Sequence, residues 1–349
     1  MYNKDINAVM ARNMGLVEPE AMNIQGYSDK RMMYPAGAAR FIHRLDANGL
    51  PAENGTNGAT PMFLTNVTEG NGYYSSLTFM LERPIWEGFS GMVAYTRSWA
   101  KNLHDGGGDQ VASMWNVLSS VNGHNNPELG FASYVPPNSL IGAVSYRYRG
   151  FTTSVFYNGS NNGRGSYTYA ANIVRDGGGA NNLIYVPTGP SDIIFVDRVV
   201  GGNVTHTAQE QSDAFFRYIE QDPYLKTRKG QYAERGGLIF PWTHIFDVKF
   251  TQDFNIAVGR TNHTLQIGID IINFGNLINS DWGAHWTTNR TQLLQMTNLN
   301  QVTPNGTVVP TFTFEPLAGT NELPTETFRK SVSAASTYRM QFSIRYFFN

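Results

Sequence analysis

Short and long connections alternate along this 349-residue chain, and the alternation limits its fold more than any other feature of the sequence. An apolar–polar period of two predicts strands near residues 2–10, 73–83, 90–100, 140–149, 151–158, 242–254, 263–274 and 337–348. Connections 84–89, 150 and 255–262 are short, whereas 13–72, 102–139, 160–241 and 275–336 are long. Outer-membrane barrels place short turns at one end and long loops at the other. The sequence therefore predicts an all-β, antiparallel transmembrane β-barrel with long extracellular loops.

The best-patterned segments combine one apolar face with one polar face. In residues 263–274, Leu265, Ile267 and Ile269 alternate with polar residues or glycine. Charged residues within such strands need water on their own face. Five charged residues on the polar faces of these strands are interpreted as lining a wet lumen or contacting an internal plug. The alternative is that they form the polar outer face of a soluble sheet. The five are Asp247, Lys249, Asp270, Arg339 and Arg345.

Charge and cysteine content exclude several classes of protein. The 26 Lys plus Arg and 27 Asp plus Glu give a net charge of −1, so no basic field is available to hold nucleic acids. The absence of cysteine excludes disulfide frameworks, cysteine-ligated zinc and thiol nucleophiles. No run reaches the roughly 18 apolar residues of a membrane-spanning helix, and the first residues do not form a signal peptide. If the chain is exported, the signal is expected to lie elsewhere.

Motifs for catalysis are missing from the sequence. It contains no P-loop, no GxSxG and no complete GxGxxG, and its seven histidines include neither an i, i+4 pair nor an HExxH motif. We therefore expect no enzymatic activity and no organic cofactor.

The long loops carry the candidate binding residues. Helical patterns lie near residues 110–120 and 209–224 and are expected to pack as loop lids. Asp176, Asn181 and Asn182 lie in or near a glycine-rich turn and are weak candidates for Ca²⁺ ligands, with a solvated turn as the favoured alternative. We expect deletion of residues 284–310 to abolish ligand binding and to leave assembly intact. Four loop aromatics are candidates for stacking on a ligand, with simple loop packing as the alternative: Trp115, Tyr134, Trp282 and Trp286.

Residues 224–283 resemble the C-terminal barrel region of the Oar-like TonB-dependent receptors of Bacteroidota-type outer membranes. Further similar segments are 166–169 (SYTY), 182–187 (NLIYVP), 273–277 (NFGNL) and 345–349 (RYFFN). The resemblance covers most of the chain from about residue 73 onward. Residues 170–175 are mostly apolar where that family usually has an acidic, Asp-Gly-rich run, which weakens any metal site that the resemblance implies.

The resemblance implies the location and the partners of the chain. It implies a Gram-negative outer membrane, and about the last eight strands of a barrel of about 22 strands. The plug, the N-terminal domains and a true start before Met1 would then lie outside this chain. Its partners would be outer-membrane lipid, the TonB complex through that plug, the barrel-assembly machinery and a surface lipoprotein. Tyr346 and Phe348 resemble the C-terminal signal that the assembly machinery recognises.

Three functions compete at this point. The first is the C-terminal barrel portion of a TonB-dependent transporter, forming wall and ligand-facing loops for energised uptake of a peptide, glycan, siderophore or protein. The second is a self-contained small outer-membrane barrel that acts as an adhesin or pore. The third is a soluble two-sheet domain that binds or hydrolyses carbohydrate.

Overall fold

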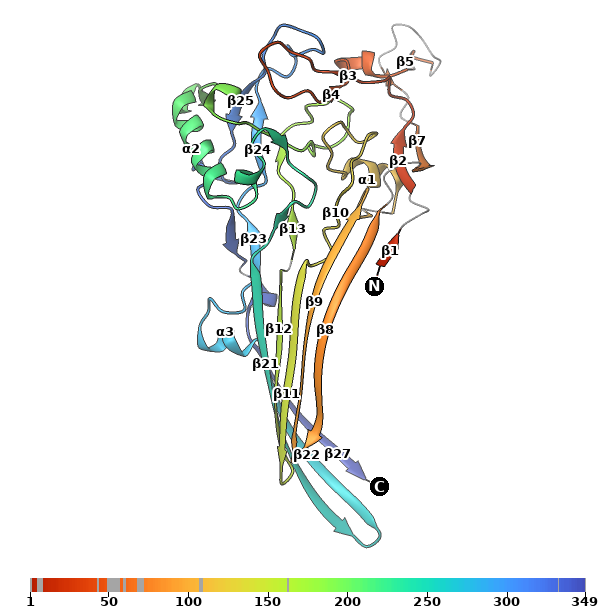
Figure 1. Cartoon of the computed structure of the whole chain (residues 1–349), viewed down its shortest axis with the longest axis vertical. Coiled ribbons are helices and arrows are strands. Elements are labelled where there is room, and N and C mark those ends of the chain that lie inside the picture. The colour runs from red at the N-terminus through yellow and green to blue at the C-terminus, as the bar shows by residue number, and fades with distance from the viewer. Residues whose placement is uncertain are drawn as a thin grey trace.

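One large antiparallel sheet dominates the molecule, which is mostly β (Figure 1). The computed structural model describes residues 2–4, 9–42, 44–48, 57–58, 61–67, 72–106, 109–161, 163–331 and 333–348. Within them the sheet has nine strands, because β10 (Gly130–Phe131) pairs with β9 beside a path of eight. The path is β1 (Tyr2–Lys4), β8 (Tyr73–Trp86), β9 (Phe89–Asn102), β11 (Asn138–Tyr148), β12 (Phe151–Asn161), β21 (Trp242–Val258), β22 (Thr261–Ile272) and β27 (Arg339–Phe348).

Two-residue turns join the long strands at one end of the sheet. Glu87 and Gly88 connect β8 to β9, and Arg149 and Gly150 connect β11 to β12, all four with positive φ as a type I′ turn requires. The β21–β22 connection, predicted over 255–262, narrows to residues 259–260. The β8–β9 and β21–β22 turns are therefore tighter than the periodicity indicates, whereas the β11–β12 turn has two residues in place of the predicted one.

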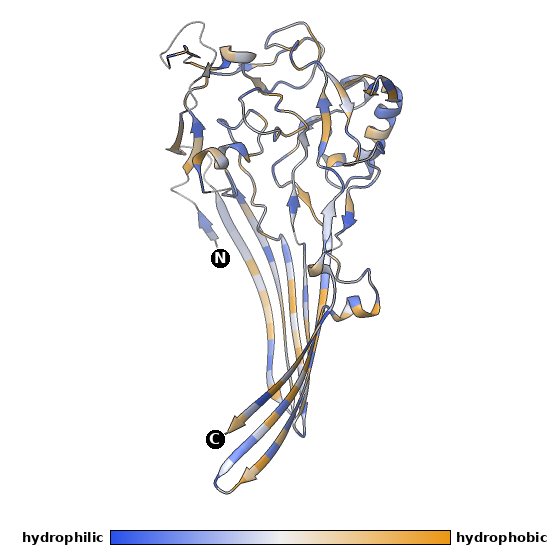
Figure 2. Cartoon of the chain, turned by 180° about the vertical axis from the view of Figure 1, so that it is seen from behind, coloured by the Kyte–Doolittle hydropathy of each residue, from blue (hydrophilic) through white to orange (hydrophobic). Residues whose placement is uncertain are grey.

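Cross-strand register gathers most of the large apolar residues of these strands on one side of the sheet, although Ile141, Phe156 and Phe347 lie on the other. Figure 2 shows apolar residues recurring along the strands. Val248 lies opposite Val155 on β12 and Ile271 on β22, and Ile269 lies opposite Phe342 on β27. We call this side the apolar face and the opposite side the polar face. Large side chains exposed on the apolar face include Leu77, Phe79, Leu81, Val93, Val144, Phe246, Phe254, Leu265, Ile267, Phe342 and Ile344.

The segment predicted as one strand over residues 2–10 is divided between two sheets. Tyr2–Lys4 pairs with β8, whereas β2 (Val9–Asn13) belongs to a separate two-stranded sheet with β7 (Met62–Asn66). Residues 5–8 lie outside the described part of the chain. The weak alternation of this segment had joined two short strands with different partners.

The four long connections fold together at the end of the sheet opposite the turns (Figure 1). We call this body, built from the described residues of 14–72, 103–137, 162–241 and 273–338, the cap. Ile24, Val121, Phe215 and Phe312, one from each connection, are buried in a single cluster. The main apolar core therefore lies in the cap and not against the large sheet.

Short strands and helices organise the cap. Its largest sheet has the order β14 (Thr168–Tyr169), β24 (Gln292–Met296), β25 (Thr311–Phe314) and β16 (Ile194–Phe195). Helix α2 (Ala208–Gln221) starts with a capping box in which Thr207 and Glu210 bond each other's backbone N–H. The two predicted loop helices are confirmed, whereas α3 (Phe274–Ile278) was not predicted. No helix within the described ranges is long and apolar enough to span a membrane.

The remaining elements of the described chain are short. The helices are α1 (Val111–Asn116) and the 3₁₀ turns Gly37–Arg40, Pro190–Asp192, Leu225–Thr227 and Ala334–Ser336. The strands are β3 (Glu20–Ala21), β4 (Met32–Met33), β5 (Arg44–Leu45), β6 (Asn57–Gly58), β13 (Arg164–Gly165), β14 (Thr168–Tyr169), β15 (Tyr185–Val186), β16 (Ile194–Phe195), β17 (Arg198–Val200), β18 (Asn203–His206), β19 (Gln231–Tyr232), β20 (Leu238–Ile239), β23 (Trp286–Thr288), β24 (Gln292–Met296), β25 (Thr311–Phe314) and β26 (Phe328–Lys330).

Candidate functional site

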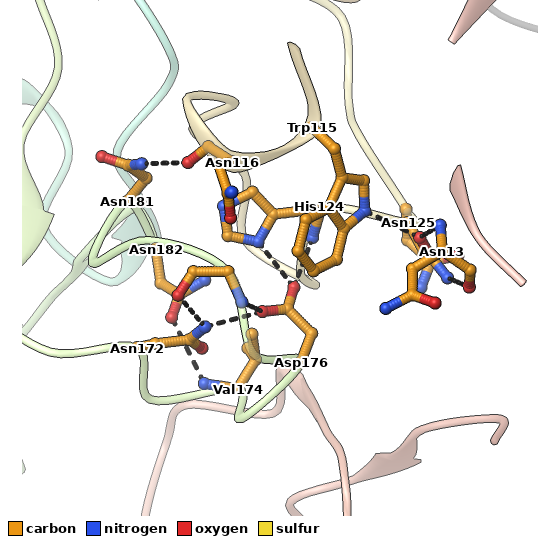
Figure 3. A network of polar contacts seen from close by, with 12 residues as sticks. Asn13, Trp115, Asn116, His124, Asn125, Asn172, Val174, Asp176, Asn181 and Asn182 are labelled. Carbon is orange, nitrogen blue, oxygen red and sulfur yellow. Dashed lines mark hydrogen bonds and ion pairs between the residues drawn. The ribbon is translucent and has the colours of Figure 1, made fainter. Parts of the chain in front are cut away.

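The carboxylate of Asp176 lies at the centre of a buried polar network in the cap (Figure 3). Its Oδ2 accepts hydrogen bonds from the backbone N and the Nδ1 of His124, both at 2.7 Å. Its Oδ1 accepts from Asn172 Nδ2 at 2.7 Å and from the backbone N of Gly178 at 3.0 Å. Burial disfavours the charged carboxylate, but the hydrogen bonds and charge interaction with His124 outweigh this, so the pKa of Asp176 lies below its usual value.

This geometry bears on the weak Ca²⁺ hypothesis for Asp176, Asn181 and Asn182. A carboxylate has about four lone-pair sites, and four N–H groups already point at the oxygens of Asp176. Asn182 Oδ1 accepts from the backbone N of Val174 at 3.3 Å. The carboxylate is not solvated either, because Asp176 is only 1% exposed, although Gly177 next to it is exposed. The network therefore fits a structural role, and the described residues contain no group of three potential His, Cys, Asp or Glu ligands.

A second buried network ties the first long connection to the third. Arg31 and Asp29 form an ion pair at 2.8 Å with both side chains fully buried. Arg31 also donates to the carbonyl oxygen of Leu183 at 3.0 Å, and its guanidinium lies over the rings of Tyr169 and Tyr232. These contacts satisfy a charge that would otherwise be costly to bury.

A third network joins the third and fourth connections through Asp222. Its Oδ2 accepts from the hydroxyls of Tyr167 and Thr327, and its Oδ1 accepts from the backbone N of Leu225 at 2.7 Å. Burial, together with the neighbouring Tyr218 and Asp222, raises the pKa of Tyr167 well above its usual value. The Tyr167 hydroxyl is therefore a fixed donor, and the cap is held in one arrangement by polar contacts as well as by its apolar core.

A polar groove of about 320 Å³ opens on the cap where three of the long connections meet. Its lining offers hydroxyl and amide groups and one guanidinium, which can hydrogen-bond a polar solute. Arg290 shares the carboxylate of Glu315 with Arg198: Glu315 Oε2 lies 3.2 Å from Arg290 Nη2, and Oε1 lies 2.8 Å from Arg198 Nη1. We call this the cap groove, lined by Ser119, Ser166, Thr168, Asn181, Asn289, Arg290, Thr291 and Gln292.

The four predicted ligand-stacking aromatics do not converge on the cap groove. Trp115 is 2% exposed, packs beside the His124 ring and donates from Nε1 to Asn125 Oδ1 at 2.8 Å. It therefore packs the cap, as the alternative interpretation had it. Tyr134 is 69% exposed on the cap surface and stays a candidate for stacking.

Trp282 and Trp286 instead line a pocket against the large sheet. This pocket of about 410 Å³ lies between α3, the segment that follows it, and β21. Trp286 donates from Nε1 to the carbonyl oxygen of Trp242 at 3.2 Å. We call this pocket the wall pocket. It is lined mainly by Trp242, His244, Phe246, Trp282, Trp286 and Lys330.

The five charged residues predicted to face a lumen or plug all belong to the polar face. Lys249 Nζ lies 2.8 Å from Asp270 Oδ1 across the β21–β22 pair. Asp247 Oδ1 accepts from the backbone N of Asn273 at 2.7 Å where β22 ends. Arg345 Nη1 donates to Gln266 Oε1 at 3.3 Å, and Arg339 lies opposite Ile272. Register thus brings them to one face, and their contact with a lumen or plug stays a prediction.

Tyr346 and Phe348 lie near the end of β27 on the apolar face. Tyr346 is opposite Leu265, and Phe348 is opposite His263. Both rings are exposed and lie close to each other. Their role as an assembly signal stays a prediction.

Sequence reasoning missed the cap groove because its lining comes from separated loop segments. The one local signal was the polar run Asn289–Gln292 directly after the short strand β23. The expected effect of deleting residues 284–310 on ligand binding and assembly stays a prediction; within them, Leu293, Leu294 and Met296 are buried in the cap core. No known protein family matches the chain, and neither a characterised protein nor a solved structure shows significant similarity to it.

Proposed function

We propose that the chain is the C-terminal barrel portion of a TonB-dependent transporter in a bacterial outer membrane. One observation carries the proposal: long strands expose an apolar face and carry most of their charged residues on the opposite face, Arg83, Arg97 and Lys101 being the exceptions on β8 and β9. Ile344, for example, is 75% exposed, whereas Lys249 and Asp270 pair on the other side. A contiguous exposed apolar surface on a folded protein marks a site of interaction with a partner or a membrane.

The dimensions of the apolar face support a membrane position. From His244 to Phe254, β21 spans about 34 Å at about 3.4 Å per residue. A strand tilt of about 40° reduces this to about 26 Å, close to the apolar band of about 25 Å in outer-membrane barrels. Aromatic residues mark both ends, with Trp242 on the cap side and Tyr148 and Phe151 near a turn.

The open edges of the sheet favour a portion of a larger barrel over a small closed one. Within the described residues, β27 pairs only with β22 and β1 only with β8. A sheet in lipid needs partners for its edge N–H and C=O groups, which closure supplies. The soluble two-sheet alternative predicts a covered apolar face, and the apolar side chains of this sheet are exposed.

The cap supports a role in solute capture at the cell surface. Its four connections share one core, and its groove offers polar, uncharged groups beside Arg290, which shares the carboxylate of Glu315 with Arg198. Such a lining suits a polar solute that presents hydroxyl or amide groups. Uptake would be driven by TonB through a plug, and a surface lipoprotein would assist at the cap.

Cysteine labelling tests the topology, because the chain contains no cysteine of its own. Tyr134→Cys places a thiol on the exposed cap surface, and Arg260→Cys places one at the β21–β22 turn. In the full-length protein, with any other cysteine replaced, a membrane-impermeant maleimide should label Tyr134→Cys on intact cells. Arg260→Cys should be labelled only after the outer membrane is opened.

Two results would contradict the proposal. One is equal labelling of both variants on intact cells, which would place turns and cap on the same side. The other is recovery of the protein in the soluble fraction. Energised transport is tested on the same cells, where solute uptake should stop when the proton-motive force is collapsed.

A further inference from the structure

The wall pocket is built on the apolar face, outside the region where a transported solute would pass. Trp242, His244 and Phe246 line it from alternate positions of β21, which place their side chains on the apolar face. Trp242 and His244 stack with an interplanar angle of 10°. The sheet therefore supplies one aromatic wall of the pocket.

The opposite wall of the pocket depends on a residue in the left-handed conformation, Asn273, directly after the end of β22. Asn273 has a φ of +54° and donates from Nδ2 to the carbonyl oxygen of Gly283 at 3.1 Å. Gly283 has a φ of +64°, and a Cβ there would lie 1.8 Å from Asn273 Oδ1. These two residues fix the loop over residues 274–286, which contains α3 and which we call the excursion. Trp282 and Trp286 on the excursion thereby line the pocket.

Apolar residues around the pocket continue the surface of the apolar face. Leu277, Ile278 and Trp282 on the excursion are exposed, with Ile278 at 61%. Exposed tryptophan at the edge of an apolar band is typical of the level where lipid headgroups begin. The pocket thus lies at the cap-side rim of the proposed membrane band.

One cation marks the polar end of the wall pocket. Lys330 Nζ lies 3.0 Å from both the carbonyl oxygen and a carboxylate oxygen of Asp281, and 5.8 Å from the centre of the Trp286 ring. Asp281 is largely exposed, so a stronger anion can reach Lys330 from solvent. A phosphate binds an ammonium through charge-assisted hydrogen bonds.

We propose that the wall pocket binds one phosphate-bearing glycerophospholipid, with an acyl chain between the aromatic walls and the phosphate at Lys330. The inference rests on the proposed membrane position of the apolar face. A lipid fits better than a soluble ligand, because the pocket continues directly into that apolar face while its charged end faces water. The excursion would then anchor the barrel wall at a defined depth.

Photo-crosslinking in nanodiscs tests this with the full-length protein. The probe is a phosphatidylglycerol with a diazirine on one acyl chain, and the comparison lipid is a diacylglycerol with the same chain. Labelled residues are mapped by mass spectrometry. We expect labelling of residues 282–286 by phosphatidylglycerol to exceed labelling of residues 340–346 on β27, which report ordinary contact with bulk lipid.

Matched variants assign the contacts. Lys330→Gln should lower pocket labelling by phosphatidylglycerol about tenfold, the change expected for one hydrogen bond to a charged group, and should not affect labelling by diacylglycerol. Asp281→Asn should raise it by freeing Lys330. Ala284→Phe, which fills the pocket, should lower labelling by both lipids, and labelling of β27 should stay constant and report correct insertion.

The outcomes separate this inference from the function on which it rests. Equal labelling of pocket and β27, with no response to Lys330→Gln or Asp281→Asn, overturns the lipid site and leaves the transporter proposal intact. Absence of label from β27 contradicts the membrane position of the apolar face and overturns both.

Discussion

The local stability of the cap should depend strongly on the carboxylate of Asp176. Asp176→Asn replaces one oxygen, which accepts hydrogen bonds, with an amide that faces the N–H groups of His124 or Gly178. We expect the free energy of local unfolding of the cap to fall by about 2–3 kcal/mol. Hydrogen exchange of cap amides measures this change. Asp109→Asn, at an exposed carboxylate next to the other glycine-rich turn, is the control and should change it by less than about 0.5 kcal/mol.

The pH dependence of the same residue follows from its lowered pKa. A group whose folded-state pKa is depressed stabilises the fold above its unfolded pKa, and the contribution is lost as pH falls through the folded pKa. The melting temperature of the wild type should therefore exceed that of Asp176→Asn by a constant amount near neutral pH. The gap should shrink only below about pH 4, the ordinary range of an aspartate. A gap that closes above pH 5 would contradict this assignment.

At the scale of a strand, neighbouring residues on β22 should differ sharply in their tolerance of charge. Ile267 lies on the apolar face in the middle of the strand, and Gln266 lies on the polar face beside Asp253. Ile267→Arg should destabilise the folded protein in the membrane by about 2–4 kcal/mol. Gln266→Arg should be tolerated. The amount of folded protein in outer-membrane fractions is the measurement, and equal levels for the two variants would argue against lipid at the apolar face.

The strands were predictable because each long strand carries its own period-two pattern. Residues 242–254 and 263–274 display both faces locally, so the sequence indicates strand, face and neighbour together. Proline at position 84 had ended the predicted strand early, whereas β8 continues to Trp86 through a shift in register between Arg83 and Trp86. Periodicity identifies a strand well and locates its end poorly.

The cap could not be predicted because its order depends on contacts between distant segments. Its strands are mostly two to five residues long, too short to show a period. Arg31 and Asp222 look like ordinary loop residues until partners more than 100 positions away are known, such as Leu183 for Arg31 and Thr327 for Asp222. The same dispersion hid the cap groove, whereas the position of the five charged residues on one face of the sheet follows from the alternation within each strand.

At the scale of the whole molecule, the cap groove should control uptake without affecting assembly. Ser119 lines the groove, and Val117, two residues away, is exposed and does not line it. Ser119→Trp should lower the apparent affinity of solute uptake by about tenfold or more, equivalent to about 1.4 kcal/mol of binding free energy. Val117→Trp should leave uptake unchanged. Uptake by cells with matched surface levels is the measurement, and equal uptake by both variants would remove the groove from the solute path.

The shared core of the cap also sets the order in which the molecule can fold. Ile24, Val121, Phe215 and Phe312 meet in one cluster although β8, β9, β11, β12, β21 and β22 lie between them in the sequence. Contacts of such high sequence separation form late, because the intervening chain must first lose its freedom. Strand pairing brings the connections to one end of the sheet, so we expect the cap to close after the hairpins have formed. A defect in any one hairpin of the large sheet should therefore appear as loss of the entire folded cap. In the proposed orientation, that loss would be detected at the cell surface.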